Sequence, residues 1–457
     1  MLQIYTPAFM PQRCAADRLC KAGDSYVVSL ITNKESHLVA VDAVIIGLGY
    51  VGLPLAQEAT RAGMTVLGFD INRGVVDALN GGVSHVDDLS DADIAEMVDA
   101  GFSATTEEGR IADAKVAVIC VPTPLSEDGG PDLRAVEGAV DAVARNLRPG
   151  MVVILESTTY PGTTDEVVRP KLEENGLVAG TDFCLAYSPE RIDPGNPTYG
   201  AKNTPKVVGG HTPECADAAA AFYGTFVDSV IRAKGTREAE TAKLLENTYR
   251  HINIALVNEM TRFCHELGID LWDVIKAAST KPFGFQAFYP GPGVGGHCIP
   301  IDPNYLSHQV RARLGYPFRF VELAQEINSG MPAYVLHRAQ DILNDLGKPL
   351  KGSTVLLLGV TYKPNIADQR ESPAVPLAKQ LVAKGARVAY HDPHVSHWGA
   401  LGDAAVRVED ATHGAADADL VVLVQNHKHY DIAAISAASK AFFDTRGVAD
   451  GEKVYRL

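Results

Sequence analysis

The chain has 457 residues, of which 46% are hydrophobic and 21% charged, and its formal net charge is −15. This length and composition are typical of a globular protein of about three domains. The negative charge argues against a nucleic-acid-binding protein and against a protein that binds an anionic membrane surface, so we expect neither partner.

The cysteines and the apolar segments predict the cellular compartment. The seven cysteines are odd in number, scattered and without a CxxC pair, so they do not indicate a disulfide framework. No apolar run reaches the roughly 18 residues that a membrane-spanning helix needs. Residues 1–40 lack the apolar core of a secretory signal and have no clear period, so we expect an extension of unknown role. The predicted location is cytoplasmic.

Residues 39–70 have the element order of a dinucleotide-binding unit. Two buried strands are predicted, with a glycine-rich turn and a helix between them: 39–46, 47–52 (GLGYVG), 53–62 and 65–69. The second strand ends at Asp70, whose carboxylate can accept hydrogen bonds from a ribose diol. Because this carboxylate would repel the 2′-phosphate of NADP, the sequence predicts NAD, with the nearby Arg73 as a weaker signal in the opposite direction.

The glycine-rich turn carries the other predicted cofactor contacts. Gly47 permits a tight turn, Gly49 lets the backbone approach a pyrophosphate, and Gly52 lets the helix pack closely against the strand. Tyr50 and Val51 complete the predicted loop.

Further strands of the same sheet are followed by polar residues. The predicted elements are strands 116–121, 151–155 and 185–187 and helix 134–146. Thr123, Thr158 and Glu190 follow the three strands, at the edge of a doubly wound sheet where ligands bind. Taken singly, each of them also fits a turn or a helix cap.

From about residue 213 the pattern becomes helical. Residues 238–267 have apolar side chains at helical spacing and predict one helix of roughly 45 Å. A helix of this length is longer than one small domain covers, so we expect it to pack across a subunit interface in a homodimer or a larger homo-oligomer. Lys243 and Asn247 are one turn apart and share a face of this helix.

A glycine-packed loop, residues 289–303, follows the long helix. Its four glycines at 291–296 let the backbone fold around a small ligand. Cys298 ends this run, and Asp302 stands one helical turn further on. A thiol beside backbone N–H groups suits nucleophilic chemistry on an anionic, phosphate-bearing ligand. A buried structural cysteine is the alternative interpretation.

Residues 348–457 predict a second α/β unit. Its predicted elements are 354–358, 374–384, 387–390, 419–424 and 441–443. This unit lacks GxGxxG, so we do not expect it to bind the dinucleotide, whereas Lys363 and Arg446 suit the diphosphate of a substrate. The predicted fold is of the α/β class, with two Rossmann-like doubly wound domains (41–212 and 348–457) joined by a central helical domain (213–347) with one long helix.

From about residue 41 to the C-terminus, the chain resembles the UDP-glucose/GDP-mannose dehydrogenase family. The segments that carry the resemblance are, in order, GLGYVGLPLA, VPTP, ESTTYPGTT, SPER, ETAKLLENTYR, GGHCIPIDP, GVTYKPNIADQRESP and DTR. Within the family, SPERIDPGN, TKPFGF and YPGPGVGGHC are most similar to the UDP-N-acetyl-D-glucosamine 6-dehydrogenases.

The resemblance implies that two NAD are reduced in succession while the C6 hydroxymethyl group of a UDP-sugar becomes a carboxylate, for surface polysaccharide precursors. Lys243 and Asn247 would surround the developing oxyanion. Cys298 would attack the aldehyde, and Glu190, with Thr158 close by, would position the water that hydrolyses the thioester.

The resemblance also implies the remaining contacts. Asp302 would orient Lys243 or the water, and Arg370 would lie near the cofactor phosphates. The residues expected at the UDP-sugar, besides the catalytic ones, are Arg191, Tyr289, Gly293, Gly295, Gly296, Lys363 and Arg446. Arg250 is expected to reach toward an N-acetyl sugar or a neighbouring subunit.

Other interpretations of the sequence stay open. One is a two-electron dehydrogenase without the cysteine step, and another is a non-catalytic NAD- or nucleotide-sugar-binding protein. UDP-glucose and UDP-N-acetyl-D-mannosamine are the alternative substrates. We predict no metal site, because there is no established ligand spacing among His297, Cys298, Asp302 and His308, or between His391 and His394.

Overall fold

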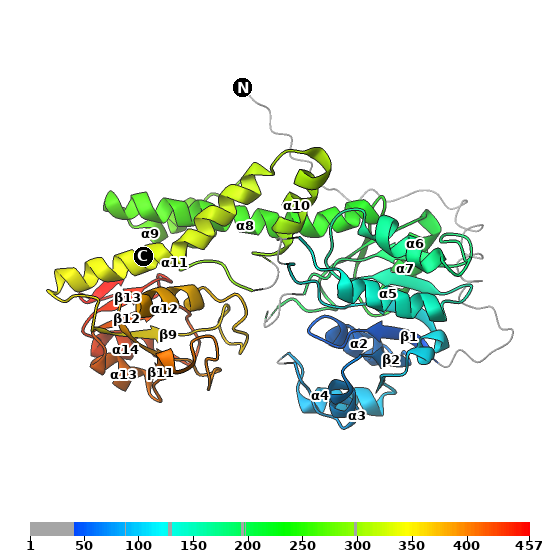
Figure 1. Cartoon of the computed structure of the whole chain (residues 1–457), viewed down its shortest axis with the longest axis horizontal. Helices are drawn as coiled ribbons and strands as arrows, with labels where there is room; N and C mark the ends of the chain where they lie inside the picture. The colour runs from blue at the N-terminus through cyan, green and yellow to red at the C-terminus, as the bar shows by residue number, and fades with distance from the viewer. Residues whose placement is uncertain (1–40, 87, 127–129, 193–195, 197, 297–298) are drawn as a thin grey trace.

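The computed structural model describes residues 41–457 apart from 87, 127–129, 193–195, 197 and 297–298. Two α/β lobes lie side by side, and a layer of long helices covers both (Figure 1). Residues 1–40, for which an extension was predicted, lie outside the described part of the chain.

In its described part, the first lobe has an eight-stranded sheet with the order β3-β2-β1-β4-β5-β6-β7-β8. The strands are β1 (Val41–Ile46), β2 (Val66–Phe69), β3 (Ser103–Thr105), β4 (Ala114–Ile119), β5 (Val152–Leu155), β6 (Cys184–Tyr187), β7 (Lys206–Gly210) and β8 (Val230–Arg232). Neighbouring strands run parallel, except that β7 is antiparallel to β6. The start of β7 therefore lies at the edge where β4, β5 and β6 end.

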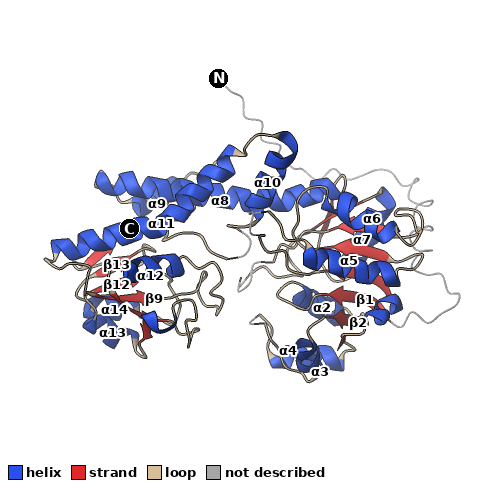
Figure 2. Cartoon of the chain, in the orientation of Figure 1, coloured by secondary structure: helices blue, strands red, loops and turns tan. Residues whose placement is uncertain are grey.

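Helices cover both faces of this sheet (Figure 2). They are α2 (Gly52–Arg61), α3 (Arg73–Asn80), α4 (Asp91–Asp99), α5 (Arg134–Asn146), α6 (Arg169–Glu173) and α7 (Pro213–Tyr223), with the shorter turns η1 (Glu108–Asp113) and η2 (Thr164–Val168). Alternate residues of β1 pack on opposite sides, because successive strand side chains point to opposite faces. Ala43 and Ile45 join the core under α2 and α7, whereas Val44 and Ile46 join the core under α5.

The second lobe has a six-stranded parallel sheet within the described residues, with the order β11-β10-β9-β12-β13-β14. Its elements are β9 (Thr354–Leu358), α12 (Ala374–Ala383), β10 (Arg387–His391), η3 (Gly402–Ala404), β11 (Ala405–Arg407), α13 (Ala411–Asp417), β12 (Leu420–Leu423), α14 (Ile432–Ala438), β13 (Phe442–Asp444) and β14 (Val454–Arg456). The two parallel-sheet lobes confirm the predicted fold class.

The helical layer consists of α8 (Thr236–Glu266), α9 (Leu271–Ala278), α10 (Asp302–Leu314) and α11 (Arg319–Asp345). The long helix α8 begins against the first lobe, where Thr236 Oγ1 donates to Asp165 Oδ2 at 2.8 Å. Just beyond its end the chain meets the second lobe, where Arg456 pairs with Asp270 at 2.8 Å. The helix predicted at 238–267 is therefore one rod that joins the two lobes.

The predicted domain boundary at residue 212 falls inside the first lobe. Helix α7 packs on β6 and β7, and β8 pairs with β7, so the first sheet continues to Arg232. No helix in the described part of the chain is both long and apolar enough to cross a membrane.

Candidate active site

The glycine-rich turn after β1 has the geometry of a pyrophosphate-binding loop. Gly47 has a φ of +91°, and a Cβ there would lie 2.9 Å from the carbonyl oxygen of Cys120. A Cβ at Gly52 would clash with the carbonyl oxygen of Gly47. A Cβ at Gly49, in contrast, would meet no described atom within 4 Å, so the backbone here faces open space. The turn therefore fits a dinucleotide phosphate at Gly49.

Asp70 is held beside the glycine-rich turn. Its Oδ2 accepts from the Leu48 backbone N–H at 3.0 Å, and its Oδ1 accepts from the Asn72 N–H at 2.8 Å. Arg73, also predicted near the cofactor, is exposed and lies 3.9 Å from Asp77. The structure thus brings Asp70, but not Arg73, into contact with the turn.

A contact between the lobes reaches the same turn. The Arg370 guanidinium of the second lobe lies 5.5 Å from the ring centre of Tyr50, a cation–π contact. Asp368 holds Arg370 through bonds from Nε to Oδ1 at 2.9 Å and from Nη2 to Oδ2 at 2.6 Å. The Gly296 N–H donates to the carbonyl oxygen of Arg370 at 3.3 Å. The glycine-rich turn and the second lobe therefore meet the loop at residues 289–303, which we call the cysteine loop.

Four of the predicted catalytic residues come together on α8 and its neighbours, and all four are buried. Lys243 Nζ donates to the backbone carbonyl oxygen of Glu190 at 2.6 Å. One turn along α8, Asn247 Nδ2 donates to Asp302 Oδ2 at 2.5 Å. Helix α8 thus aligns the end of β6 with the start of α10. We name these four residues the catalytic cluster after their predicted role; Glu190 joins it through its backbone carbonyl oxygen.

Burial raises the pKa of Asp302 to about 6, although the charge of Lys243 and the hydrogen bond from Asn247 oppose this. The Asp302 carboxyl is therefore ionised at neutral pH, although its ionised form is less stable in the folded protein than it would be in water. At acidic pH the Asp302 carboxyl becomes neutral, and the cluster loses this one negative charge.

A substitution of Asp302 tests this linkage. In Asp302→Asn the free energy of unfolding should rise by about 1–3 kcal/mol at pH 7.5 and by less than about 1 kcal/mol at pH 4. At pH 4 the carboxyl of the folded chain is protonated, and that of the unfolded chain, with an ordinary pKa of 3.8, is about half protonated. The penalty of its charge develops between pH 4 and 6 and is complete above pH 6. Urea unfolding at both pH values measures the difference, with the exposed Asp228→Asn as control; an equal gain at both would contradict it.

The Glu190 side chain is anchored from two sides. Its Oε1 accepts from the Ile192 backbone N–H, and its Oε2 lies 3.3 Å from Lys206 Nζ. Burial tends to raise the pKa of Glu190, but the positive charge of Lys206 and hydrogen bonding outweigh burial and lower it. Lys206 lies at the start of β7, and no local sequence signal pointed to it.

The loops after β4 and β5 are joined through backbone oxygens. Thr123 Oγ1 donates to the Thr158 carbonyl oxygen at 2.8 Å, and the Tyr305 hydroxyl of α10 donates to the Thr123 carbonyl oxygen. Thr159 is fully buried, and its hydroxyl has no hydrogen-bond partner among the described residues. The sequence pointed to Thr158, whereas the buried hydroxyl without a partner belongs to its neighbour Thr159.

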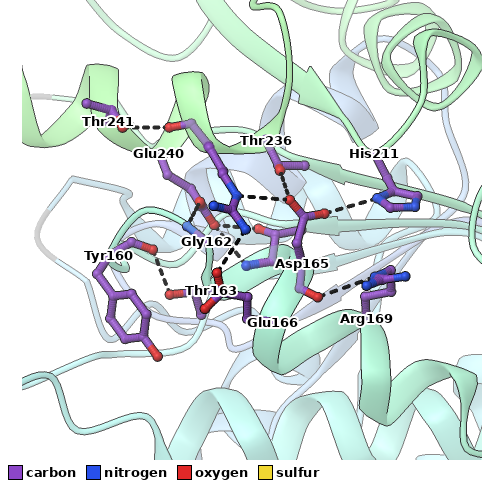
Figure 3. Close-up of polar contacts among 12 residues, drawn as sticks. Tyr160, Gly162, Thr163, Asp165, Glu166, Arg169, His211, Thr236, Glu240 and Thr241 are labelled. Carbon is purple, nitrogen blue, oxygen red and sulfur yellow. Dashed lines mark hydrogen bonds and ion pairs between the residues drawn. The ribbon is translucent and has the colours of Figure 1, made fainter. Parts of the chain in front are cut away.

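A second network holds the ESTTYPGTT loop against the first turn of α8 (Figure 3). The Glu240 carboxylate accepts from the backbone N–H groups of Gly162 at 2.5 Å and Thr164 at 2.9 Å. Asp165 lies between Thr236 and His211 and accepts from Thr236. Because Glu240 is one turn before Lys243, this network fixes where the catalytic cluster begins.

The cysteine loop packs too tightly for side chains at its glycines. The Gly291 N–H donates to Asn258 Oδ1 of α8 at 3.0 Å. A Cβ at Gly295 would lie 2.6 Å from the carbonyl oxygen of Glu371, and one at Gly296 would lie 2.7 Å from the Tyr362 ring. Gly293 has a φ of +140°. The loop is therefore pressed against the second lobe.

Cys298, the predicted nucleophile, and His297 lie outside the described residues. Within the described part of the chain, no group of three or more His, Cys, Asp or Glu side chains is placed to hold a metal ion.

The predicted substrate residues fall into two groups. Arg446 Nε donates to the Val424 carbonyl oxygen at 2.8 Å, and its Nη1 lies 3.0 Å from the position of a Cβ on Gly291, beside the loop. Burial lowers the pKa of Arg446 to about 10, so it stays cationic at neutral pH. Lys363 is partly buried in the same lobe.

The other group consists of Arg191 after β6, Arg250 on α8 and Tyr289 at the start of the loop. Arg191 pairs with Glu246 of α8 at 2.7 Å and donates to the Pro205 carbonyl oxygen at 2.7 Å. Tyr289 and Arg250 are exposed on this chain.

Comparison with known proteins gives matches in both lobes and in the helical layer between them. Models of the UDP-glucose/GDP-mannose dehydrogenase family match at residues 41–227 (NAD binding domain), 237–330 (central domain) and 356–456 (UDP binding domain). A UDP-N-acetyl-D-glucosamine 6-dehydrogenase of Pseudomonas aeruginosa is 35% identical over 418 residues, 90% of this chain and 97% of the relative.

Two further similarities concern mannosamine enzymes. A UDP-N-acetyl-D-mannosamine dehydrogenase of Salmonella typhi is 33% identical over 88% of this chain and 98% of the relative. The structure of a UDP-D-ManNAc dehydrogenase from Pyrococcus horikoshii superposes with a TM-score of 0.82 at 30% identity, over 91% of this chain and 99% of that one. These matches confirm the predicted family, enzyme class and cofactor. The chain belongs to the UDP-glucose/GDP-mannose dehydrogenase family and is an NAD-dependent UDP-sugar dehydrogenase.

Proposed function

We propose that this enzyme oxidises the C6 hydroxymethyl group of UDP-N-acetyl-D-glucosamine to the carboxylate, a four-electron reaction that supplies a surface polysaccharide precursor. The observation that carries the proposal is the buried catalytic cluster next to the cysteine loop. The cluster consists of Glu190, Lys243, Asn247 and Asp302. The 35% identical relative from Pseudomonas aeruginosa supports this sugar. The cytoplasm, which holds NAD and nucleotide sugars, is the proposed location.

We assign cofactor binding to the first lobe and UDP binding to the second. The glycine-rich turn and Asp70 would hold NAD, with Thr123, Thr158 and Arg370 beside it. When bound, NAD supplies the hydride acceptor for both oxidations. The cysteine loop, Lys363 and Arg446 would hold the UDP-sugar, with Arg191 and Tyr289 at the edge of that site.

In the first oxidation, the chain must stabilise the alkoxide that forms at C6. The Lys243 ammonium, desolvated and fixed on the Glu190 carbonyl oxygen, supplies positive charge without reorganisation. The Asn247 amide, fixed by Asp302, orients the hydroxyl. The hydroxyl proton leaves through ordered water.

In the second oxidation, the Cys298 thiolate adds to the aldehyde, and loss of hydride from C6 gives a thioester. Water then attacks the thioester carbonyl, its proton passes to the Glu190 carboxylate, and the C–S bond breaks to release the thiolate. The covalent bond explains why the aldehyde need not leave between the two oxidations.

A panel of UDP-sugars tests the proposal. Counting NADH per sugar should give two, with the highest kcat/KM for UDP-N-acetyl-D-glucosamine and a preference for NAD over NADP. In Cys298→Ser, acid formation should fall by at least about a thousandfold, because the covalent step is lost. One NADH per sugar would remove the mechanism. A preference for UDP-N-acetyl-D-mannosamine, the substrate named for two of the relatives, or for UDP-glucose would change only the sugar.

We also propose a homodimer built on α8. Exposed apolar side chains form a stripe at helical spacing on this helix: Leu245 (65% exposed), Tyr249 (46%), Leu256 (54%) and Phe263 (46%). Arg250 is exposed beside Tyr249, which favours contact with a neighbouring subunit.

Light scattering should therefore give about twice the 48.8 kDa chain mass. Leu256→Asp should shift the mass to the monomer, since it buries a charge in the interface. The control Val406→Asp, exposed on the second lobe, should remain a dimer. A monomeric wild-type protein would remove the proposal.

A further inference from the structure

Three charged side chains are buried together behind Glu190. Glu156 follows β5, Glu190 follows β6 and Lys206 begins β7, and all three are almost fully buried. Because β7 runs antiparallel to its neighbour β6, its first residue lies at the edge where β5 and β6 end. The sheet topology therefore delivers one lysine to two carboxyl groups that come from separate strands.

The contacts within this triad are short. Lys206 Nζ bonds to Glu156 Oε1 and lies 3.3 Å from Glu190 Oε2. The Tyr223 hydroxyl donates to Glu156 Oε2 at 2.6 Å. Both carboxyl groups therefore bind the same ammonium, and one proton on the pair would balance its second negative charge. With that proton, the triad has no net charge, as a buried site requires.

The other titratable groups around Glu190 come from every element packed against it. They are Cys120 after β4, Tyr187 of β6, Tyr223 of α7 and Lys243 of α8, with Arg191 next in the chain. Burial raises the pKa of Cys120, Tyr187 and Tyr223, which stay neutral. Arg191 is paired with Glu246. Lys206 and Lys243 are thus the cations that act on Glu190.

The shared proton resides on Glu156. Burial, together with the charge of Glu190, raises the pKa of Glu156 to about 7, although Lys206 opposes this. Glu190 has two further partners that stabilise its ionised form, the Ile192 N–H and the charge of Lys243, whereas Glu156 has one neutral donor, the Tyr223 hydroxyl. Glu190 is therefore the carboxyl that stays ionised.

We propose that Lys206 and Glu156 are positioning residues that control the charge of Glu190 during thioester hydrolysis, Lys206 keeping it ionised and Glu156 storing the shared proton. This rests on the role of Glu190 under the proposed function. When Glu156 is ionised, the triad carries one negative charge. After Glu190 takes the proton of the attacking water, Lys206 can pass one proton to Glu156 while it takes that proton from Glu190. Glu190 then returns to the carboxylate, Glu156 holds the proton, and the triad is neutral. A small cavity lined by Glu190, Ile192 and Lys206 lies beside this path.

The pH dependence of thioester hydrolysis, followed as acid formed in single turnovers, tests the proposal. In the wild type, the rate should show an acid limb from Glu190 and a second rise near pH 7 from Glu156. Glu156→Gln should keep the acid limb and lose the rise near pH 7. Lys206→Met should move the acid limb to higher pH by about one unit or more, because Glu190 loses its nearest cation. Lys206→Arg should restore it in part.

Each outcome bears on the proposal. Profiles lowered evenly at every pH, with the same inflections as the wild type, would indicate a merely structural triad and overturn it. If Lys206→Met does not fold, the double variant Glu156→Gln/Lys206→Met replaces both neighbours of Glu190 with neutral side chains. Its acid limb should be raised in the same way. Two NADH per sugar with unshifted profiles would sink this inference alone, whereas one NADH per sugar would sink the proposed function.

Discussion

Lys243→Met is expected to lower kcat/KM about a thousandfold, the size of effect seen when a preorganised oxyanion partner is removed. Methionine keeps the apolar stem of the lysine but removes the charge that faces the reacting oxygen. It also leaves the Glu190 carbonyl oxygen without its donor at 2.6 Å, and the Asp302 carboxylate without a nearby cation. Initial rates of NADH formation across substrate concentrations measure the change.

The matched control is Lys276→Met, which removes an exposed lysine from α9. It should leave kcat/KM within about twofold of the wild type, since exposed charges contribute little. If Lys243→Met kept more than a tenth of the wild-type kcat/KM while the thermal unfolding midpoint was unchanged, Lys243 would not be the electrostatic catalyst.

Gly52→Ala should weaken NAD binding more than tenfold and destabilise the first lobe by about 1–3 kcal/mol or more. A Cβ at this position clashes with the Gly47 carbonyl oxygen and lies 3.1 Å from the Ile45 side chain, so α2 must move away from β1. That movement displaces the N–H groups of the turn. Denaturant unfolding and NAD titration by fluorescence measure the two effects.

Gly49→Ala separates the two effects. Because a Cβ there meets no described atom within 4 Å, its stability should equal that of the wild type, while NAD affinity still falls. Equal loss of stability in both variants would show that the fold itself requires glycine at both positions. It would contradict the view that Gly49 is needed to leave room for the phosphate.

Much of the fold was predictable because its elements have strong local patterns. The helix at 134–146 and the strand at 354–358 coincide with α5 and β9. Helical structure was predicted from about residue 213, where α7 begins, but the end of α7 was not predicted. Its segment PECADAAAAFY has five alanines in eleven residues and marks no distinct apolar face. The short strand β8, VIR, gives too few residues for an alternating pattern.

In the candidate site, too, residues with a local sequence pattern were predictable, whereas residues brought together by the tertiary fold were not. Lys243 and Asn247 share a helical face that the sequence makes visible, and the structure buries both. Lys206 and Glu156 could not be found this way, since they meet only because β7 turns back beside β6. Thr159 and Thr158 are adjacent, and only the packing of the loop decides which hydroxyl is buried without a partner.

Helix α8 contacts the ESTTYPGTT loop at Glu240 and carries Lys243 and Asn247. Further along, it contacts the cysteine loop at Asn258. Glu240 and Asn258 are separated by roughly 27 Å of continuous rod. Inserting a single residue after Asn247 would rotate everything beyond it by about 100° and advance it by about 1.5 Å. Asn258 would then face away from Gly291. The number of residues between Glu240 and Asn258 is thus fixed. During evolution, insertions and deletions can be accommodated only in the loops outside this part of α8.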